Sequence, residues 1–159
     1  MEDLGSRVER ALDSPGGLEA RLYAALSVVA DRFGAQIGTL HLLDPEGKTL
    51  LLKAFVGAMP PAVLEASRAV PVGKGMAGLA ASRREPVSTC DLQTDASGVA
   101  RPGARATGLR GTLCVPMLDA KRLGGTLGIG CEEERVFTPE ETAALLDAGS
   151  RIARTVFSA

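Results

Sequence analysis

Hydrophobic residues recur every three or four positions near both ends of the chain. Such spacing is typical of amphipathic helices. It predicts a short helix over 4–12, a longer helix over 17–33, and a third helix through 142–157. Gly34 stands just past the second helix, where a left-handed cap is needed. The third helix is preceded by the capping box Thr138-Pro139-Glu140-Glu141.

Short apolar runs separated by turn residues occupy the middle of the chain. The runs 37–43 and 50–56 flank the turn Asp-Pro-Glu-Gly, and 112–117 and 123–130 flank Asp-Ala-Lys-Arg. Each pair predicts an antiparallel hairpin. Two short strands and two short helices are also predicted, at 70–72 and 86–89 for the strands and at 60–68 and 76–83 for the helices.

Residues 91–110 depart from this pattern, because they are polar or small and show little periodicity. A loop of this length inside a compact domain is typically a lid or a binding loop. The strands 37–43 and 112–117 are apolar at nearly every position, so both of their faces should be covered. We expect the terminal helices on one face and the short helices with the loop on the other, where a ligand cavity can form.

The whole chain, residues 1–159, is therefore expected to be one α+β domain with a core at about 15–157. Its composition is that of a globular protein, with 45% hydrophobic and 23% charged residues. The net charge of −1 and the lack of a basic stripe argue against nucleic-acid binding. No apolar run is long enough to cross a membrane, and the polar residues 1–7 do not resemble a signal peptide, so a cytoplasmic location is expected.

The residues that commonly carry catalysis or bind metals are sparse. His41 is the single histidine, and the three cysteines, Cys90, Cys114 and Cys131, are far apart in the sequence. We found no spacing typical of a structural zinc site and no pattern of a serine–histidine–aspartate triad. Buried free thiols are the expected state of all three cysteines.

Several short motifs occur in an order that resembles the GAF domain family. They are Gly38-Thr39-Leu40-His41-Leu42-Leu43-Asp44, Val72-Gly73-Lys74-Gly75-Met76-Ala77-Gly78, Cys114-Val115-Pro116-Met117, Leu123-Gly124-Gly125-Thr126-Leu127-Gly128-Ile129 and Val136-Phe137-Thr138-Pro139-Glu140-Glu141. The resemblance covers about 15–157. It implies a profilin-like, six-stranded antiparallel sheet between the terminal helices and a ligand pocket under short helices and a loop. It names no particular ligand or cofactor.

The candidate site follows from strand alternation and from this resemblance. Leu40 and Leu42 should face the terminal helices, which sends Thr39 and His41 to the pocket face. A haem ligand and a structural histidine are both open roles for His41. In the loop, Arg101 and Arg105 are suited to binding a carboxylate or a phosphate. Asp91 is a further candidate for contact with a ligand. The full set of candidate ligand-binding residues is Thr39, His41, Met76, Cys90, Asp91, Arg101, Arg105, Cys114 and Thr126.

The predicted function is a non-catalytic, small-molecule-binding sensory or regulatory domain of bacterial-type signal transduction. The alternative is a thiol-based redox enzyme or switch related to the free methionine-(R)-sulfoxide reductases, which belong to the same family. The cysteine that those enzymes carry after their glycine-lysine-glycine segment is replaced here by Ala77. Cys90, beside Asp91, is the remaining candidate for a reactive thiol. The broad apolar stripes on the terminal helices suggest a homodimer.

Overall fold

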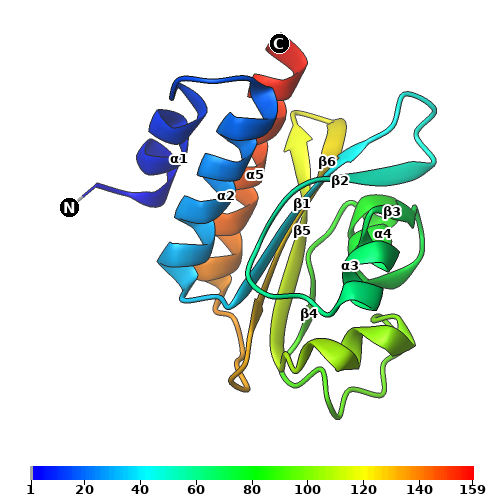
Figure 1. The fold of residues 1–159 in the computed structure, drawn as a ribbon. Coiled ribbons are helices and arrows are strands. Elements are labelled where there is room, and N and C mark those ends of the chain that lie inside the picture. Colours follow the sequence, from blue (N-terminus) through cyan, green and yellow to red (C-terminus); the bar gives the residue numbers. More distant parts are fainter. Residues whose placement is uncertain (1) are drawn as a thin grey trace.

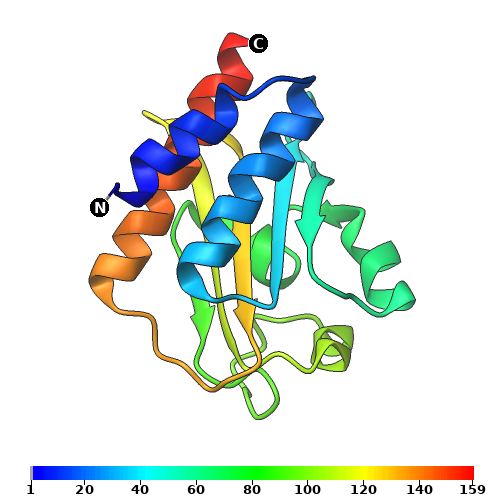
Figure 2. The same cartoon turned by 60° about the vertical axis from the view of Figure 1, so that its left-hand side comes forward.

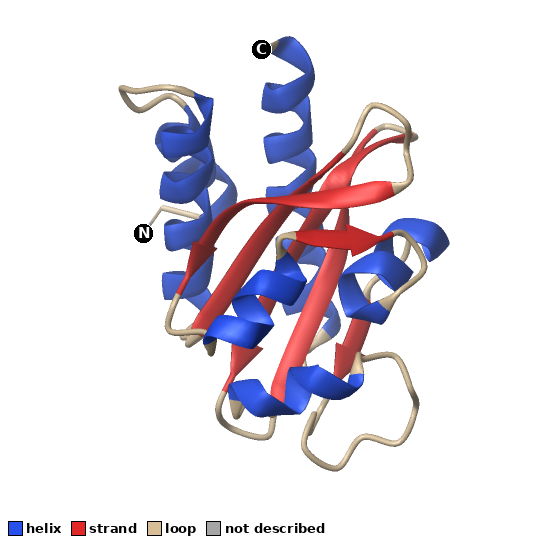
Figure 3. Ribbon diagram, turned by 45° about the vertical axis from the view of Figure 1, so that its right-hand side comes forward, coloured by secondary structure: helices blue, strands red, loops and turns tan. Residues whose placement is uncertain are grey.

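The structure is a computed structural model that describes residues 2–159; Met1, part of the polar N-terminus considered above, lies outside the described residues. Six antiparallel strands form its central sheet, in the order β3-β2-β1-β6-β5-β4 (Figure 3). The strands are β1 (Ile37–Leu43), β2 (Thr49–Val56), β3 (Ala69–Pro71), β4 (Val87–Thr89), β5 (Gly111–Asp119) and β6 (Arg122–Cys131). The predicted α+β class and sheet are thus confirmed.

Helices cover both faces of the sheet (Figures 1 and 2). One face carries α2 (Leu18–Phe33) and α5 (Pro139–Ser158), with α1 (Leu4–Leu12) packed on both of them. The other face carries α3 (Pro61–Ser67), α4 (Gly75–Arg83) and a 3₁₀ turn, η1 (Pro102–Thr107). This turn lies inside the segment predicted to be an irregular loop.

The main core lies between the sheet and the terminal helices. Leu40 of β1, Leu127 of β6 and Val115 of β5 lie side by side across three central strands, and each is 0% exposed. Side chains from all three helices complete this cluster, among them Val8, Leu26 and Ile152. Leu40 therefore faces the helices, as strand alternation predicts.

The ends of the long helices have the caps that the sequence predicts. Thr138 Oγ1 accepts a hydrogen bond from the Glu141 backbone N–H at 3.1 Å, and Glu141 Oε1 accepts one from the Thr138 backbone N–H at 3.0 Å. Gly34 adopts a φ of 61° after the last turn of α2, which a residue without Cβ does at low cost.

α1 covers much of the apolar surface that motivated the dimer prediction. Its buried side chains, Leu4, Val8 and Leu12, belong to the same cluster as those of α2 and α5. Among residues 2–159, the large hydrophobic residues that stay exposed are Tyr23, at 53%, and Val136, at 79%. The apolar faces of α2 and α5 thus pack partly against α1 of the same chain.

Across residues 2–159, no helix is both long enough and apolar enough to cross a bilayer.

Candidate functional site

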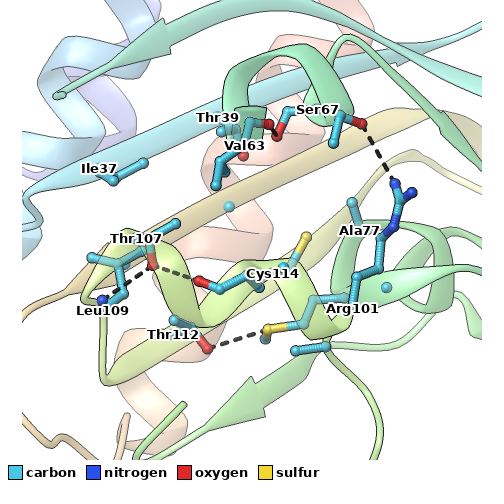
Figure 4. Close-up of a pocket in the computed structure, with 18 of the residues that line it drawn as sticks. Ile37, Thr39, Val63, Ser67, Ala77, Arg101, Thr107, Leu109, Thr112 and Cys114 are labelled. Atoms are coloured by element: carbon cyan, nitrogen blue, oxygen red, sulfur yellow. Dashed lines mark hydrogen bonds between the residues drawn. The ribbon is translucent and has the colours of Figure 1, made fainter. Parts of the chain in front are cut away.

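A cavity of about 510 Å³ lies between the sheet and the elements on its second face (Figure 4). Three strands, β1, β5 and β6, form its floor, and α3, α4 and residues 100–109 form its walls and roof. Most of the lining side chains are apolar. Pockets of this size and character commonly bind small organic molecules.

Two glycines on the central floor strand let neighbouring side chains lie close to the cavity floor. Gly128 of β6 lies between Thr39 of β1 and Cys114 of β5. A Cβ at Gly128 would lie 3.0 Å from Thr39 Oγ1, and a Cβ at Gly130 would lie 2.4 Å from Leu109 Cδ1. Because β6 contributes no side chain at these two positions, Thr39 can lie close to Gly128 and Leu109 can pack directly over Gly130.

His41 lies on the cavity floor and is 3% exposed. Its Nε2 lies 2.8 Å from the Ser67 carbonyl oxygen, which can only accept, so Nε2 carries the proton. Burial lowers the pKa of His41, and the neutral ring then has an acceptor at Nδ1. His41 Nδ1 and the hydroxyl of its cross-strand neighbour Thr126 are both buried without a hydrogen-bond partner among the described residues.

The lowered pKa of His41 predicts a loss of stability in mild acid. The unfolded chain binds a proton near the ordinary histidine pKa of 6.5, whereas the folded chain binds it only at lower pH. The free energy of unfolding should therefore be greatest above about pH 6.5 and fall below it, by up to about 1.4 kcal/mol per pH unit. Urea denaturation between pH 5.5 and 7.5 measures this slope while carboxylates stay ionised.

The matched variant for this measurement is His41→Gln, whose amide can still donate to the Ser67 carbonyl but does not titrate. Its free energy of unfolding should be flat over the same pH range. An equal slope in the variant would show that a group other than His41 causes it.

Cys114 and Met76 line the cavity beside the floor strands. Burial raises the pKa of the Cys114 thiol to about 12, so the thiol is protonated at neutral pH. Thr112 Oγ1 lies 3.2 Å from Met76 Sδ and 2.6 Å from Thr89 Oγ1. These contacts fix the thioether of α4 above β5.

Hydrogen bonds within the segment 91–110 join its two ends and hold it along its length. Arg110 Nη1 donates to Asp91 Oδ2 at 2.6 Å, which pairs the two ends of the segment. Gln93 Nε2 donates to the carbonyl oxygens of Arg105 and Leu109, at 3.1 and 2.7 Å. These bonds hold the segment in shape, and most of its residues between 100 and 109 line the cavity.

The two candidate arginines lie in different surroundings. Arg101 lines the cavity, and its Nη1 donates to the Ala66 carbonyl oxygen of α3 at 3.4 Å. Arg105 donates from Nη2 to the Asp95 carbonyl oxygen at 2.8 Å. It lines an adjoining hollow of about 360 Å³ that also contacts Arg101.

Five of the nine candidate residues lie in the cavity lining: Thr39, His41, Met76, Arg101 and Cys114. The other four lie outside the lining. Asp91 pairs with Arg110, and Arg105 donates to the Asp95 carbonyl oxygen. Thr126 is buried beside His41, and Cys90 is exposed. The prediction that all three thiols are buried is thus wrong for Cys90, because it lies at the end of edge strand β4, where the chain enters the loop.

Sequence reasoning missed the two floor glycines and the wall formed by α3. Gly128 and Gly130 alternate with Leu127 and Ile129, which belong to the helix-facing core. Glycines that alternate with large apolar residues along a strand indicate a face that a ligand or another part of the chain approaches closely. Val63 and Ala66 of α3 gave no such signal.

Solved structures with the same fold include both GAF domains of larger proteins and enzymes. The GAF domains of phosphoenolpyruvate-protein phosphotransferases from Coxiella burnetii and Acinetobacter are 21% and 19% identical to this chain, with TM-scores of 0.81 and 0.79. In both cases 98% of this chain and 91% of the other are covered. A free methionine-R-sulfoxide reductase from Neisseria meningitidis, in complex with its substrate, is 19% identical with a TM-score of 0.78, over 98% of this chain and 87% of that one.

These neighbours correct one prediction. The expectation that the chain is not an enzyme does not follow from its fold, because reductases share that fold. Identities of this size show the fold alone, so they assign neither the reductase activity nor its absence. No curated protein matches the chain in sequence.

The sequence itself carries the family assignment. The sequence profile of the GAF domain matches residues 17–156, which span α2 to α5 and include every element around the cavity. The chain belongs to the GAF domain family.

Proposed function

We propose that this GAF domain binds a small molecule in the cavity above β1, β5 and β6 and has a sensory or regulatory role in bacterial-type signal transduction. The observation that carries the proposal is the apolar cavity of about 510 Å³ under the 100–109 segment. Water in contact with the apolar lining of such a cavity is released when a small molecule binds, which favours binding.

The sheet offers a route from the cavity to the terminal helices. Thr39 faces the cavity, while the adjacent Leu40 packs in the core under those helices. A ligand that favours one arrangement of the floor and the roof therefore also favours one packing of the opposite face. The ligand acts by shifting the population between two arrangements, to the extent that its affinity for them differs.

A thermal-shift screen of nucleotides, amino acids, haem and bilins, followed by a cavity-blocking variant, tests the proposal. A ligand at 100 times its dissociation constant should stabilise the protein by about 2.7 kcal/mol. Thr39→Phe should place a ring in the cavity and raise the dissociation constant about 100-fold, which would reduce the stabilisation to about 0.4 kcal/mol. The measurement is the shift in unfolding free energy with and without the ligand.

Ser88→Phe is the matched control, because Ser88 is an exposed strand residue outside the cavity lining. It should keep the full ligand effect. If Thr39→Phe keeps it as well, the ligand binds elsewhere and the proposal fails.

A thiol-based redox function is the second candidate. The favouring observations are the fold shared with free methionine-R-sulfoxide reductases and the exposure of Cys90. Reduction of free methionine-R-sulfoxide by the wild-type protein, lost in Cys90→Ser and kept in Cys131→Ser, would support this candidate. Lack of turnover by the wild-type protein would count against it.

A homodimer formed through the terminal helices and a cytoplasmic location complete the proposal. The apolar character of the terminal helices supports the dimer. Because α1 covers part of this apolar area, less of it is left for a second copy. Sedimentation equilibrium measures the dimer directly. A monomer at all concentrations would remove the dimer from the proposal without affecting the ligand site.

A further inference from the structure

Three parts of the fold meet at one arginine, Arg135, in the chain that connects β6 to α5 (Figure 2). Its backbone N–H donates to the Cys90 carbonyl oxygen at 3.0 Å, where the segment 91–110 begins. Its Nη1 donates to the Phe33 carbonyl oxygen at 2.6 Å, in the last turn of α2. Its Nη2 pairs with Glu141 Oε2 in the first turn of α5. One residue thus contacts the base of the cavity roof and the ends of both long helices.

The side-chain bonds of Arg135 match the charge at the two helix ends. The Phe33 carbonyl is one of the last four of α2, which have no partner within a helix and carry partial negative charge. The Thr138 amide and the Arg135 guanidinium lower the pKa of Glu141, so this carboxylate is ionised at neutral pH. A planar guanidinium can donate to a carbonyl and to a carboxylate at once.

The ion pair is partly shielded from water. The side chains of Arg135 and Glu141 are 28% and 23% exposed, against 58% and 79% for the surface pair Arg68 and Glu65. The centroid of the Phe137 ring lies 4.6 Å from Arg135 Cζ, so the ring covers one face of the guanidinium. Because a half-buried pair is screened less than an exposed one, this contact joins its partners more strongly than a surface pair does.

The base of the segment also lies against the same connection. The Arg110 amide donates to the Cys131 carbonyl oxygen at 2.8 Å, and the Gly111 amide donates to the Glu133 carbonyl oxygen at 2.9 Å. A Cβ at Gly111 would lie 2.6 Å from Arg135 Cβ, so the connection crosses directly over the start of β5. A shift of this base must therefore displace the connection.

The roof and the base of the segment form one hydrogen-bonded unit. Gln93 Nε2 donates to the Leu109 carbonyl oxygen at 2.7 Å, and Leu109 lines the cavity. The Leu92 amide donates to the Arg110 carbonyl oxygen at 2.7 Å. A displacement of the roof is thus expected to displace the base as well.

We propose that Arg135 is a positioning residue that couples the cavity roof to the ends of α2 and α5 by contacts outside the sheet. This inference rests on the proposed function and names how a change at the same site is passed to the terminal helices. When the roof changes its arrangement, the Cys90 carbonyl displaces the Arg135 backbone, and the guanidinium changes its contacts with Phe33 and Glu141. The two helix ends therefore respond together to the state of the roof.

Hydrogen–deuterium exchange of the intact chain, measured by mass spectrometry, tests the coupling without a ligand. Gln93→Ala removes two hydrogen bonds that hold the roof. It should raise exchange rates about threefold or more in the segment 91–110 and also in peptides covering 30–36 and 140–146. In an Arg135→Gln background the segment should still respond to Gln93→Ala, whereas the two helix-end peptides should not.

Glu141→Gln separates coupling from stability. Its amide oxygen can still accept from the Thr138 amide, so the capping box remains, but its amide nitrogen cannot accept from Arg135. The response of the α5 peptide to Gln93→Ala should be lost in this background. The response of the α2 peptide should be kept, because Arg135 still donates to the Phe33 carbonyl. A purely stabilising role of Arg135 would not produce this selective loss.

Arg151→Gln is the matched control, because Arg151 lies on α5 and pairs with Asp147 and Glu9. Both helix-end responses should persist in that background. Urea denaturation shows whether each variant is folded.

The inference is overturned if the helix ends do not respond to Gln93→Ala in otherwise wild-type protein, or if they respond equally with Arg135→Gln. Should Arg135→Gln not fold, an unchanged α5 response in Glu141→Gln overturns it instead. These outcomes leave the proposed ligand site standing, because exchange is measured without a ligand. Failure of the ligand screen, in turn, does not alter the exchange result.

Discussion

Replacing Leu127 by alanine is expected to lower the free energy of unfolding by about 3 kcal/mol. Leu127 is 0% exposed in the central strand β6, between Leu40 and Val115 on the neighbouring strands. Truncation removes buried methyl groups and leaves a void that the flanking strands and helices cannot fill by small shifts. Urea denaturation followed by far-UV circular dichroism measures the change.

Val136→Ala is the control, because Val136 is 79% exposed and loses little when truncated. Its effect should stay within about 0.5 kcal/mol. Equal costs at the two positions would contradict the assignment of the main core to the helix-facing side of the sheet.

The regular elements could be predicted closely from the sequence because local signals specify them. The helix predicted over 17–33 is found at Leu18–Phe33, and the strand predicted over 37–43 is found at Ile37–Leu43. Periodicity, the αL glycine and the capping box are all encoded within a few residues of where they act. The ends of the short strands and helices of the second face shift by at most one residue, within the usual variation of element ends.

The candidate site was only partly predictable, because its geometry depends on long-range contacts. Alternation along β1 correctly sends Thr39 and His41 to the cavity. It cannot reveal that Asp91 pairs with Arg110, 19 residues away, or that Arg105 turns to the Asp95 carbonyl. The 3₁₀ turn at Pro102–Thr107 was also missed, since so short an element leaves no periodic pattern.

One strand links the two faces of the domain. Leu127 and Ile129 of β6 belong to the main core, and Gly128 and Gly130, which alternate with them, lie on the cavity floor. The same segment thus contributes to the main core on one face of the sheet and to the cavity floor on the other. A side chain at Gly130 would displace Leu109, whose Cδ1 would lie 2.4 Å from the new Cβ, whereas truncation of Leu127 would leave a void in the main core.

Replacing Gly78 by alanine is expected to cost about 3 kcal/mol and to distort the cavity wall. Gly78 is buried in α4, and a Cβ there would lie 2.5 Å from the Pro71 carbonyl oxygen and 3.0 Å from the Gly73 amide nitrogen. Both contacts are with backbone, so neither can be relieved by a side-chain rotation. The helix must move away from the turn, which strains the hydrogen bond from the Gly73 amide to the Gly78 carbonyl oxygen.

Because Met76 and Ala77 of α4 line the cavity, this movement should also weaken any ligand that depends on the wall. Gly103→Ala is the stability control, since a Cβ at Gly103 would meet no atom within 4 Å. Its effect on the free energy of unfolding should remain within about 0.5 kcal/mol. If both substitutions are equally mild in urea denaturation, α4 is not held against the 71–73 turn by close backbone contact, and the wall of the cavity is free to adjust.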